Sequence, residues 1–199
     1  PPEGLWGMPK AVLETLPGYS GTLAERQAEA RRIMTSLGYG PSNRLKIKLT
    51  TRDFSSYKEP AVILVDQLNK TYFDAELEIV ESTIWFGRAG RQDYTIAFNL
   101  SGVAIDDPDV TMTENFACAS ENNFSKYCNA DVDRMLVRQS SERDPEKRKQ
   151  IALAVSDRVM DQASYIVLGQ YKAFGAYRKD RISGWLAGPV PVWWNIVKK

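Results

Sequence analysis

The stretch from residue 45 to residue 100 alternates strand patterns with helix patterns, and this alternation restricts the possible folds more than any other feature. Leu45-Lys-Ile-Lys-Leu49 places apolar and cationic residues at alternate positions, which predicts a strand with one solvated face near a sheet edge. Strands are predicted over residues 45–49, 75–80 and 94–100, and helices over residues 56–72 and 83–89. This order predicts an α/β fold with a largely parallel sheet and helices on both faces.

Helix signals also flank this region. Thr22 and Glu25 form a capping box before a helix that is expected to end at Gly38. Asn129 is expected to cap a later helix, with two aspartates in its first turn, and Asp144-Pro145 opens a longer one. The apolar side of helix 56–72 is predicted to carry Val62, Val65, Leu68 and Tyr72.

The last third of the chain is less regular. Residues 165–168 are predicted to form a strand after the last helix. Residues 171–199 show little periodicity and contain three tryptophans, so they are expected to be a piece of something larger.

Composition excludes several function classes. The 26 lysines and arginines and the 25 acidic residues are dispersed, so nucleic acid is not an expected partner. The longest apolar runs are far shorter than the roughly 20 residues of a membrane span. The sequence has no histidine, which excludes Ser-His-Asp and Cys-His nucleophiles and imidazole zinc ligation. No metal or cofactor is expected.

Cys118 and Cys128 are the only two cysteines, and both lie in one polar, asparagine-rich segment. They are either two unrelated buried thiols or a disulfide. A bridge closing a loop of about ten residues would contribute on the order of 3 kcal/mol. We favour the bridge, which implies an oxidising compartment.

An acidic turn, Asp106-Asp107-Pro108-Asp109, follows the predicted strand 94–100. Ligands of open α/β sheets bind beyond the carboxyl ends of strands, so the turn is either ligand-facing or a local cap of the next helix. Trp85 can stack on a ligand or belong to the core. Arg91 can meet a ligand carboxylate or cover a helix end.

An enzymatic alternative uses the same turn. Asp107-Pro-Asp-Val-Thr111 fits the Asp-x-Asp-x-Thr signature of haloacid-dehalogenase-like phosphatases, in which one of Asp107 and Asp109 would attack phosphorus and the other would serve as acid and base. That family places its motif on the first strand and needs a downstream lysine and a paired-acid magnesium site. The sequence after Thr111 shows neither convincingly.

The order of motifs resembles the dipeptide and oligopeptide type (family 5) of extracytoplasmic solute-binding proteins of ABC transporters. The motifs that carry the resemblance are residues 33–39, residues 45–51, the Asp-Pro-Asp turn, residues 116–118, residues 123–129 and Asp144-Pro145. The resemblance implies a non-enzymatic, periplasmic clamshell of two lobes that closes on a peptide or another small polar solute. It also implies membrane permease subunits as partners.

The chain is expected to be a fragment, the C-terminal portion of such a protein, with a type II periplasmic-binding-protein-like lobe. Residues 1–21 would be a leader or hinge crossing from a missing first lobe. Residues 22–168 would form the second ligand-binding lobe, and residues 169–199 would return toward the first.

The sequence departs from the peptide binders beyond the strand 94–100. Ser101-Gly102-Val103-Ala104 stands where those proteins place Trp and Asp, the latter pairing with the peptide ammonium. A sugar, an opine-like conjugate or another small polar solute is therefore as compatible with the sequence as a peptide ligand is. The residues expected to face the ligand are Ser101, Gly102, Asp106, Asp107, Trp85 and Arg91.

Overall fold

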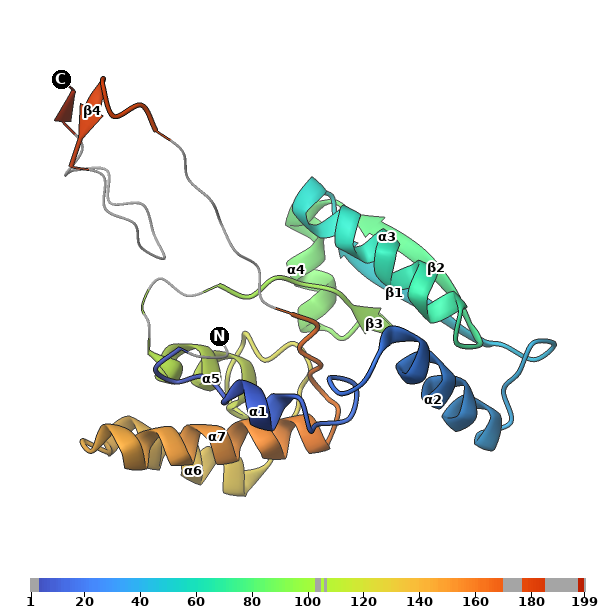
Figure 1. Cartoon of the computed structure of the whole chain (residues 1–199), viewed down its shortest axis with the longest axis horizontal. Helices are drawn as coiled ribbons and strands as arrows, with labels where there is room; N and C mark the ends of the chain where they lie inside the picture. The colour runs from blue at the N-terminus through green and yellow to red at the C-terminus, as the bar shows by residue number, and fades with distance from the viewer. Residues whose placement is uncertain (1–3, 103–104, 106, 170–176, 185–196, 199) are drawn as a thin grey trace.

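A parallel three-stranded sheet organises the first half of the protein (Figure 1). The computed structural model describes residues 4–102, 105, 107–169, 177–184 and 197–198. The strand order is β2-β1-β3, formed by β1 (Leu45–Arg52), β2 (Phe73–Val80) and β3 (Ile96–Ala97). β1 pairs with all of β2 but with β3 only at Leu49 and Thr50. The predicted α/β class and parallel sheet are confirmed.

The prediction that the first strand lies near an edge is wrong, because β1 is the central strand of this sheet. Alternate residues of β1 are buried: Ile47, Leu49 and Thr51. Lys46 and Lys48 instead line a shallow hollow with Asp74 and Glu76 of β2. The lysines therefore lie on a solvent-exposed face of β1, in the part of the strand that pairs with β2 but not with β3.

The third strand is shorter than predicted. Beyond Ala97 only Phe98 still bonds to β1, through its N–H to the Thr50 carbonyl at 2.9 Å. Residues 99–102 then continue without regular secondary structure. The pattern of apolar residues over 94–100 therefore predicted a strand longer than the pairing supports.

The capping-box helix is confirmed as α2 (Leu23–Ser36). The Thr22 N–H donates to Glu25 Oε2 at 2.7 Å, and the Glu25 N–H donates back to Thr22 Oγ1 at 3.3 Å. Gly38 follows the helix with a φ of 88°, a left-handed conformation that glycine adopts without strain. The Tyr39 N–H then reaches the Met34 carbonyl at 2.9 Å, which closes a Schellman motif.

The two crossover helices are α3 (Ser55–Asn69) and α4 (Ser82–Gly90). In α3 the side facing the sheet centres on Ala61, which is fully buried, whereas Val62 is 55% exposed and does not face the core as predicted. On α4, Trp85 and Ala89 are buried against Val80 at the carboxyl end of β2. α4 thus packs over the carboxyl half of the sheet.

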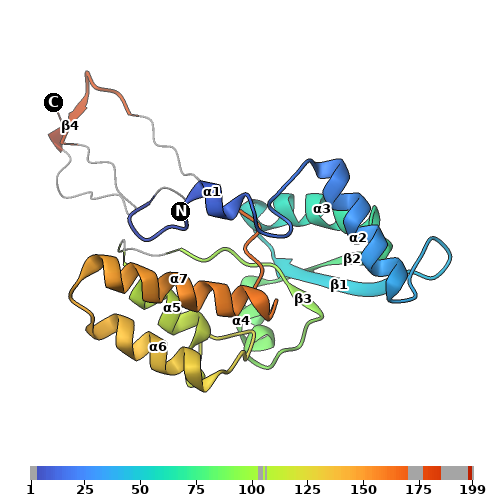
Figure 2. The ribbon, with the colours of Figure 1, turned by 60° about the horizontal axis from the view of Figure 1, so that its bottom comes forward.

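A second layer consists of the helices α5 (Pro108–Phe116), α6 (Ala130–Ser141) and α7 (Pro145–Asp161), which pack side by side (Figure 2). Asn129 caps α6 and Asp144 caps α7, both as predicted. Buried residues of α6 and α7 form the core of this layer: Val132, Leu136, Val155 and Val159.

The loop between α5 and α6 joins the two layers. The predicted disulfide between Cys118 and Cys128 closes this loop. Phe124 at its centre packs edge-on against Trp85 of α4, with ring centroids 5.5 Å apart. The Tyr94 hydroxyl also donates to the Phe124 carbonyl at 2.7 Å.

Residues 165–168 do not form the predicted strand. They run beside the N-terminal segment, where the Tyr19 hydroxyl donates to the Val167 carbonyl. The remaining elements are α1 (Lys10–Leu13) and a two-stranded antiparallel pair of β4 (Ile182–Ser183) and β5 (Val197–Lys198). Most of the predicted return segment lies outside the described residues.

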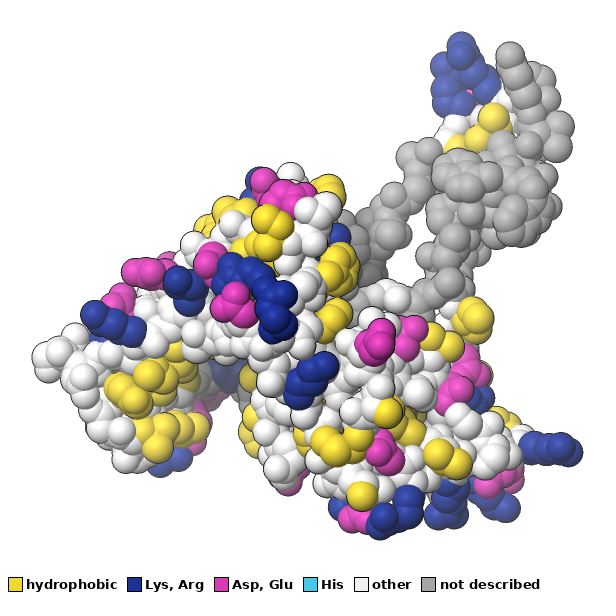
Figure 3. Space-filling view, turned by 180° about the vertical axis from the view of Figure 1, so that it is seen from behind, with side chains coloured by type: hydrophobic (Ala, Val, Ile, Leu, Met, Phe, Trp, Pro, Cys, Tyr) yellow, Lys and Arg dark blue, Asp and Glu magenta, His cyan; other side chains and the backbone are white. Residues whose placement is uncertain are grey.

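Two further observations concern the exterior. In the part of the chain that the structure describes, none of the helices has the length and apolar character needed to cross a membrane. On the face shown in Figure 3, lysine and arginine side chains are interspersed with aspartate and glutamate, so that face carries no continuous basic surface.

Candidate functional site

The strand order places the topological switch point of the sheet between β1 and β3. The chain moves from β1 to β2 on one side and then returns to β3 on the other side. Ligands of open α/β sheets bind outside the carboxyl ends of the strands at such a switch in direction. The residues at this point are Thr51 and Arg52 at the end of β1, and the segment 98–102 after β3.

Segment 98–102 is anchored to β1 at its first residue only. The Thr51 hydroxyl, fully buried, donates to the Phe98 carbonyl at 3.1 Å. Within the described part of the chain, the backbone N–H and C=O groups of residues 99–102 take part in no backbone hydrogen bond. Ser101 and Gly102 are exposed, and a Cβ added to Gly102 would meet no atom within 4 Å. Residues 99–102 therefore present polar backbone at the carboxyl edge of the sheet that is not hydrogen-bonded to the described backbone.

Ser101 also contacts the chain that follows α7. Burial raises the pKa of the Tyr165 phenol, and a hydrogen bond with the Ser101 side chain acts in the opposite direction. Tyr165 in turn packs edge-on against Phe116 of α5. Segment 98–102 is thus supported from the helical layer as well as from β1.

Arg52 ends β1 at the same edge and lies among aromatic rings. Its guanidinium carbon is 4.9 Å from the ring centroid of Tyr57 and 4.8 Å from that of Phe86. The guanidinium donates to the Tyr57 hydroxyl at 3.1 Å and to the Ser82 hydroxyl at 3.4 Å. Among the residues that the structure describes, no carboxylate forms an ion pair with Arg52.

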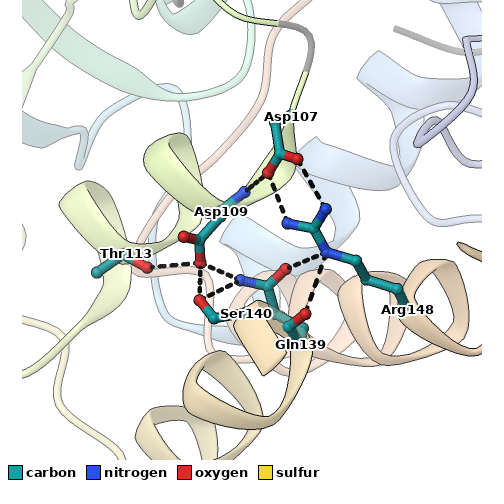
Figure 4. A network of polar contacts seen from close by, with 6 residues as sticks. All are labelled: Asp107, Asp109, Thr113, Gln139, Ser140 and Arg148. Carbon is teal, nitrogen blue, oxygen red and sulfur yellow. Dashed lines mark hydrogen bonds and ion pairs between the residues drawn. The ribbon is translucent and has the colours of Figure 1, made fainter. Parts of the chain in front are cut away.

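The acidic turn is engaged within the protein (Figure 4). Asp107 caps α5 by accepting the Asp109 N–H at 2.9 Å. Its two carboxylate oxygens also accept from the fork of Arg148 at 2.6 and 2.7 Å. This bidentate contact holds the pKa of the Asp107 carboxyl below its usual value, against the opposing effect of burial.

The Asp109 carboxylate also accepts hydrogen bonds from side chains within the protein. Its Oδ1 accepts from Gln139 and Ser140 of α6 and from the Thr113 hydroxyl. Gln139 is fully buried, so this contact fixes the start of α5 against α6. With both carboxylates committed to internal partners, the geometry does not favour the phosphatase alternative. The described residues contain no group of three or more acidic or cysteine side chains suited to a metal ion.

The other predicted site residues are dispersed. Trp85 is 2% exposed and belongs to the core beside Phe124. Arg91 is the exposed C-cap residue of α4. Asp106 and Ala104 lie outside the described residues. Of the described residues in the predicted set, Ser101 and Gly102 lie exposed at the carboxyl edge of the sheet.

Arg52, Thr51 and Arg148 were not singled out from the sequence. Arg52 carried a usable signal, because it is the last residue of a strand and the rule that drew attention to the acidic turn applies equally to it. The roles of Thr51 and Arg148 depend on contacts to Phe98 and Asp107, 47 and 41 residues away in the chain. No local pattern reveals such partners.

No family model matches the sequence, and no curated protein does so. Solved structures do match. The Escherichia coli murein tripeptide binding protein MppA aligns with a TM-score of 0.65 and 20% identity, over 80% of this chain and 32% of that one. Haemophilus influenzae OppA in complex with RPPGFSPFR aligns with a TM-score of 0.65 and 21% identity, over 74% of this chain and 29% of that one. DppA from Helicobacter pylori in complex with peptide STSA aligns with a TM-score of 0.61 and 21% identity, over 77% of this chain and 30% of that one.

These similarities show the fold. Over about three quarters of its length, the chain folds like part of the peptide-binding proteins of the periplasmic-binding-protein-like class. The chain spans about 30% of the length of these structures. The fold predicted from the order of the motifs is thereby confirmed.

Proposed function

We propose that the chain supplies one lobe of a solute-binding protein of an ABC import system. The observation that carries the proposal is the combination of this fold with an exposed, anchored segment at the switch point of the sheet. The solved structures with this fold are described as binding a murein tripeptide or a peptide. The ligand here would be a peptide or another small polar solute.

Segment 98–102 would provide the contact surface for that ligand. The backbone N–H and C=O groups of residues 99–102, which form no backbone hydrogen bond within the described residues, can donate and accept hydrogen bonds as a sheet edge does toward an extended chain. The anchor from Thr51 fixes where the segment starts, so fewer degrees of freedom are lost when a ligand binds. Ser101 and Gly102 would face the ligand, with Arg91 at the periphery; the predicted contact Asp106 lies outside the described residues.

Asp107 and Trp85 would then act indirectly. Asp107 holds the start of α5 through Arg148, and Trp85 holds α4 against the disulfide-closed loop. Both support the walls around the edge and leave direct contact to the segment itself.

The lobe would work outside the cytoplasm. The Cys118–Cys128 disulfide fits an oxidising compartment such as the periplasm. Residues 22–168 would form the lobe, with residues 1–21 and 169–199 connecting it to a first lobe, and permease subunits would receive the solute. The chain would turn nothing over.

Native mass spectrometry of the protein recovered from the periplasm of an expressing bacterium tests this proposal. We expect a retained small molecule that is released on unfolding and identified by fragmentation. A bulky substitution, Gly102→Phe, should abolish retention because it fills the open space beside the segment. Gly40→Phe is the matched control, since Gly40 precedes the amino end of β1 and also has open space around it.

Two outcomes would count against the proposal. One is a protein that retains nothing and shows no thermal shift with panels of peptides, sugars and opines. The other is equal loss of the retained molecule in Gly102→Phe and Gly40→Phe, which would place the binding surface elsewhere.

A further inference from the structure

β2 is an edge strand, and its outer side faces no other strand among the described residues. The Leu45 N–H donates to the Tyr72 carbonyl, and the Asp53 N–H donates to the Val80 carbonyl. The even-numbered residues of β2 therefore face β1, so the N–H and C=O groups of its odd-numbered residues point outward. An edge of this kind is a template on which a second copy of the chain can pair.

The Asn69 side chain occupies part of this outer edge. Asn69 is the last residue of α3, and its carboxamide meets Ala75 of β2. The Asn69 Oδ1 accepts the Ala75 N–H at 2.8 Å, and the Asn69 Nδ2 donates to the Ala75 carbonyl at 3.3 Å. A further strand would exchange the same two kinds of hydrogen bond with Ala75. Asn69 therefore takes the place of one residue of such a strand.

Arg44 covers the neighbouring outward-facing carbonyl. Its Nη1 donates to the Phe73 carbonyl at 2.9 Å and to the Asn69 carbonyl at 2.7 Å. Arg44 directly precedes β1 and Asn69 ends α3, so both side chains reach the edge from outside β2. Together they bind two of the four outward-facing residues of β2, Phe73 and Ala75.

The outward-facing residues in the other half of β2 are Leu77 and Ile79. Within the described part of the chain, their N–H and C=O groups form no hydrogen bond on the outer side of the strand. Ile79 is 48% exposed. Strands of globular proteins usually have roughly 3–10 residues, so these two alone offer too short a stretch for stable pairing. Pairing along β2 therefore requires displacement of the Asn69 side chain.

The acidic residues of β2 act in the same direction. Asp74, Glu76 and Glu78 alternate with the outward-facing residues. In an antiparallel pair of two β2 strands, outward-facing residues lie opposite each other, so the intervening acidic residues of the two copies also meet. Like charges directly opposite each other destabilise a pair of strands.

We propose that Asn69 and Arg44 close the outer edge of β2 against pairing with a second copy of this chain. Asn69 has the larger part, because it binds both backbone groups of Ala75, and Arg44 extends the cover to Phe73. This role is independent of any solute that the chain would bind. β1 needs no such cover, because it is the central strand.

Asn69→Ala tests the proposal in the whole chain. Sedimentation velocity over a range of protein concentrations measures self-association, and hydrogen exchange reports on the edge. We expect the variant to self-associate at least about tenfold more tightly than wild type. In dilute solution its Ala75 amide should lose protection, and at high concentration the amides of Ala75, Leu77 and Ile79 should all become protected. A contact that only stabilised the end of α3 would not produce this gain.

Asn123→Ala is the matched control. Asn123 also binds two backbone groups through its carboxamide, the carbonyls of Ala117 and Tyr127, but it lies in the disulfide-closed loop. Its replacement should destabilise the chain without increasing self-association. The double variant Asn69→Ala and Ile79→Lys should return to the association of wild type, because a lysine on an edge strand opposes pairing.

Three results would overturn the proposal: no gain in association for Asn69→Ala, an equal gain for Asn123→Ala, or a gain that persists when Ile79→Lys is added. Should Asn69→Ala not fold, Arg44→Ala decides the question, because Arg44 is exposed and its loss leaves the core intact. Arg44→Ala should self-associate several-fold more tightly than wild type, and an unchanged association would then contradict the proposal.

Discussion

Asp107 is the residue whose role changed most between sequence and structure. It looked like either a ligand contact or a phosphatase nucleophile, but it caps α5 and receives the fork of Arg148. Arg148 also donates to the Gln139 carbonyl at 3.0 Å, and its guanidinium lies 4.9 Å from the Trp6 ring centroid. One ion pair thus links the start of α5, α6, α7 and the N-terminal segment.

Asp107→Asn should destabilise the protein in a pH-dependent way. Because the folded-state pKa of Asp107 is lowered, its contribution is complete above the unfolded pKa of about 4 and is lost as pH falls through the folded value. Asparagine keeps the cap, so the expected loss at neutral pH is about 1–3 kcal/mol from the ion pair.

Urea unfolding at several pH values measures this effect. The difference between wild type and Asp107→Asn should shrink as the pH falls below about 4. Asp66→Asn removes the exposed pair with Lys70 and should cost no more than about 0.5 kcal/mol. A pH-independent cost at Asp107 would show that the ion pair is not its source.

Two short elements hold the layers together. The loop closed by Cys118 and Cys128 presents Phe124 to α4, and segment 98–102 leaves β3 toward the helical layer. Each is fixed by few contacts, so each can be perturbed without dismantling a helix or a strand.

Replacing both cysteines with serine should lower the free energy of unfolding by about 3 kcal/mol, the value for a loop of this length. The loop is also expected to loosen around Phe124. Denaturant unfolding of the double variant, compared with wild type before and after reduction, measures the change. Reduction of wild type should reproduce the variant, and a reduced protein as stable as the oxidised one would contradict the prediction.

Thr51→Val should release segment 98–102 from β1. Valine preserves the shape but leaves the Phe98 carbonyl without the hydroxyl, at a cost of about 1 kcal/mol. We expect faster hydrogen exchange at the Phe98 amide and weaker retention of ligand. Thr50→Val is the matched control, because Thr50 is equally buried but donates to Glu78 instead.

If Thr50→Val accelerates exchange at Phe98 as much as Thr51→Val does, the anchor is not specific to Thr51. The comparison therefore separates general loosening of β1 from loss of the hydrogen bond between the Thr51 hydroxyl and the Phe98 carbonyl.

For the molecule as a whole, the fold and the acidic turn bear on the proposed function. Of the described residues of the acidic turn, Asp107 and Asp109 both bind internal partners. A sheet with an open switch point beside a helical layer is compatible with the proposed role as one half of a ligand cleft.

We accordingly expect no magnesium-dependent hydrolysis of a generic aryl phosphate above background. The wild type and Asp107→Asn should be indistinguishable in this assay. Hydrolysis that depends on magnesium and disappears in Asp107→Asn would restore the phosphatase alternative and contradict the proposed function.

The sequence by itself determined the elements and the class of fold. Periodicity and caps depend on residues within a few positions of one another, so α2, α6 and α7 were identified from Thr22, Asn129 and Asp144. The motif order pointed to the fold, and the close spacing of the two cysteines pointed to the disulfide.

Only the tertiary structure decided the position and pairing of these elements. β1 is central although its lysines suggested an edge, residues 165–168 are not a strand, and the acidic turn faces Arg148. It also assembled Arg52 with rings from two helices beside segment 98–102. The physical reason is that burial and charge pairing depend on partners tens of residues away, which a local pattern does not specify.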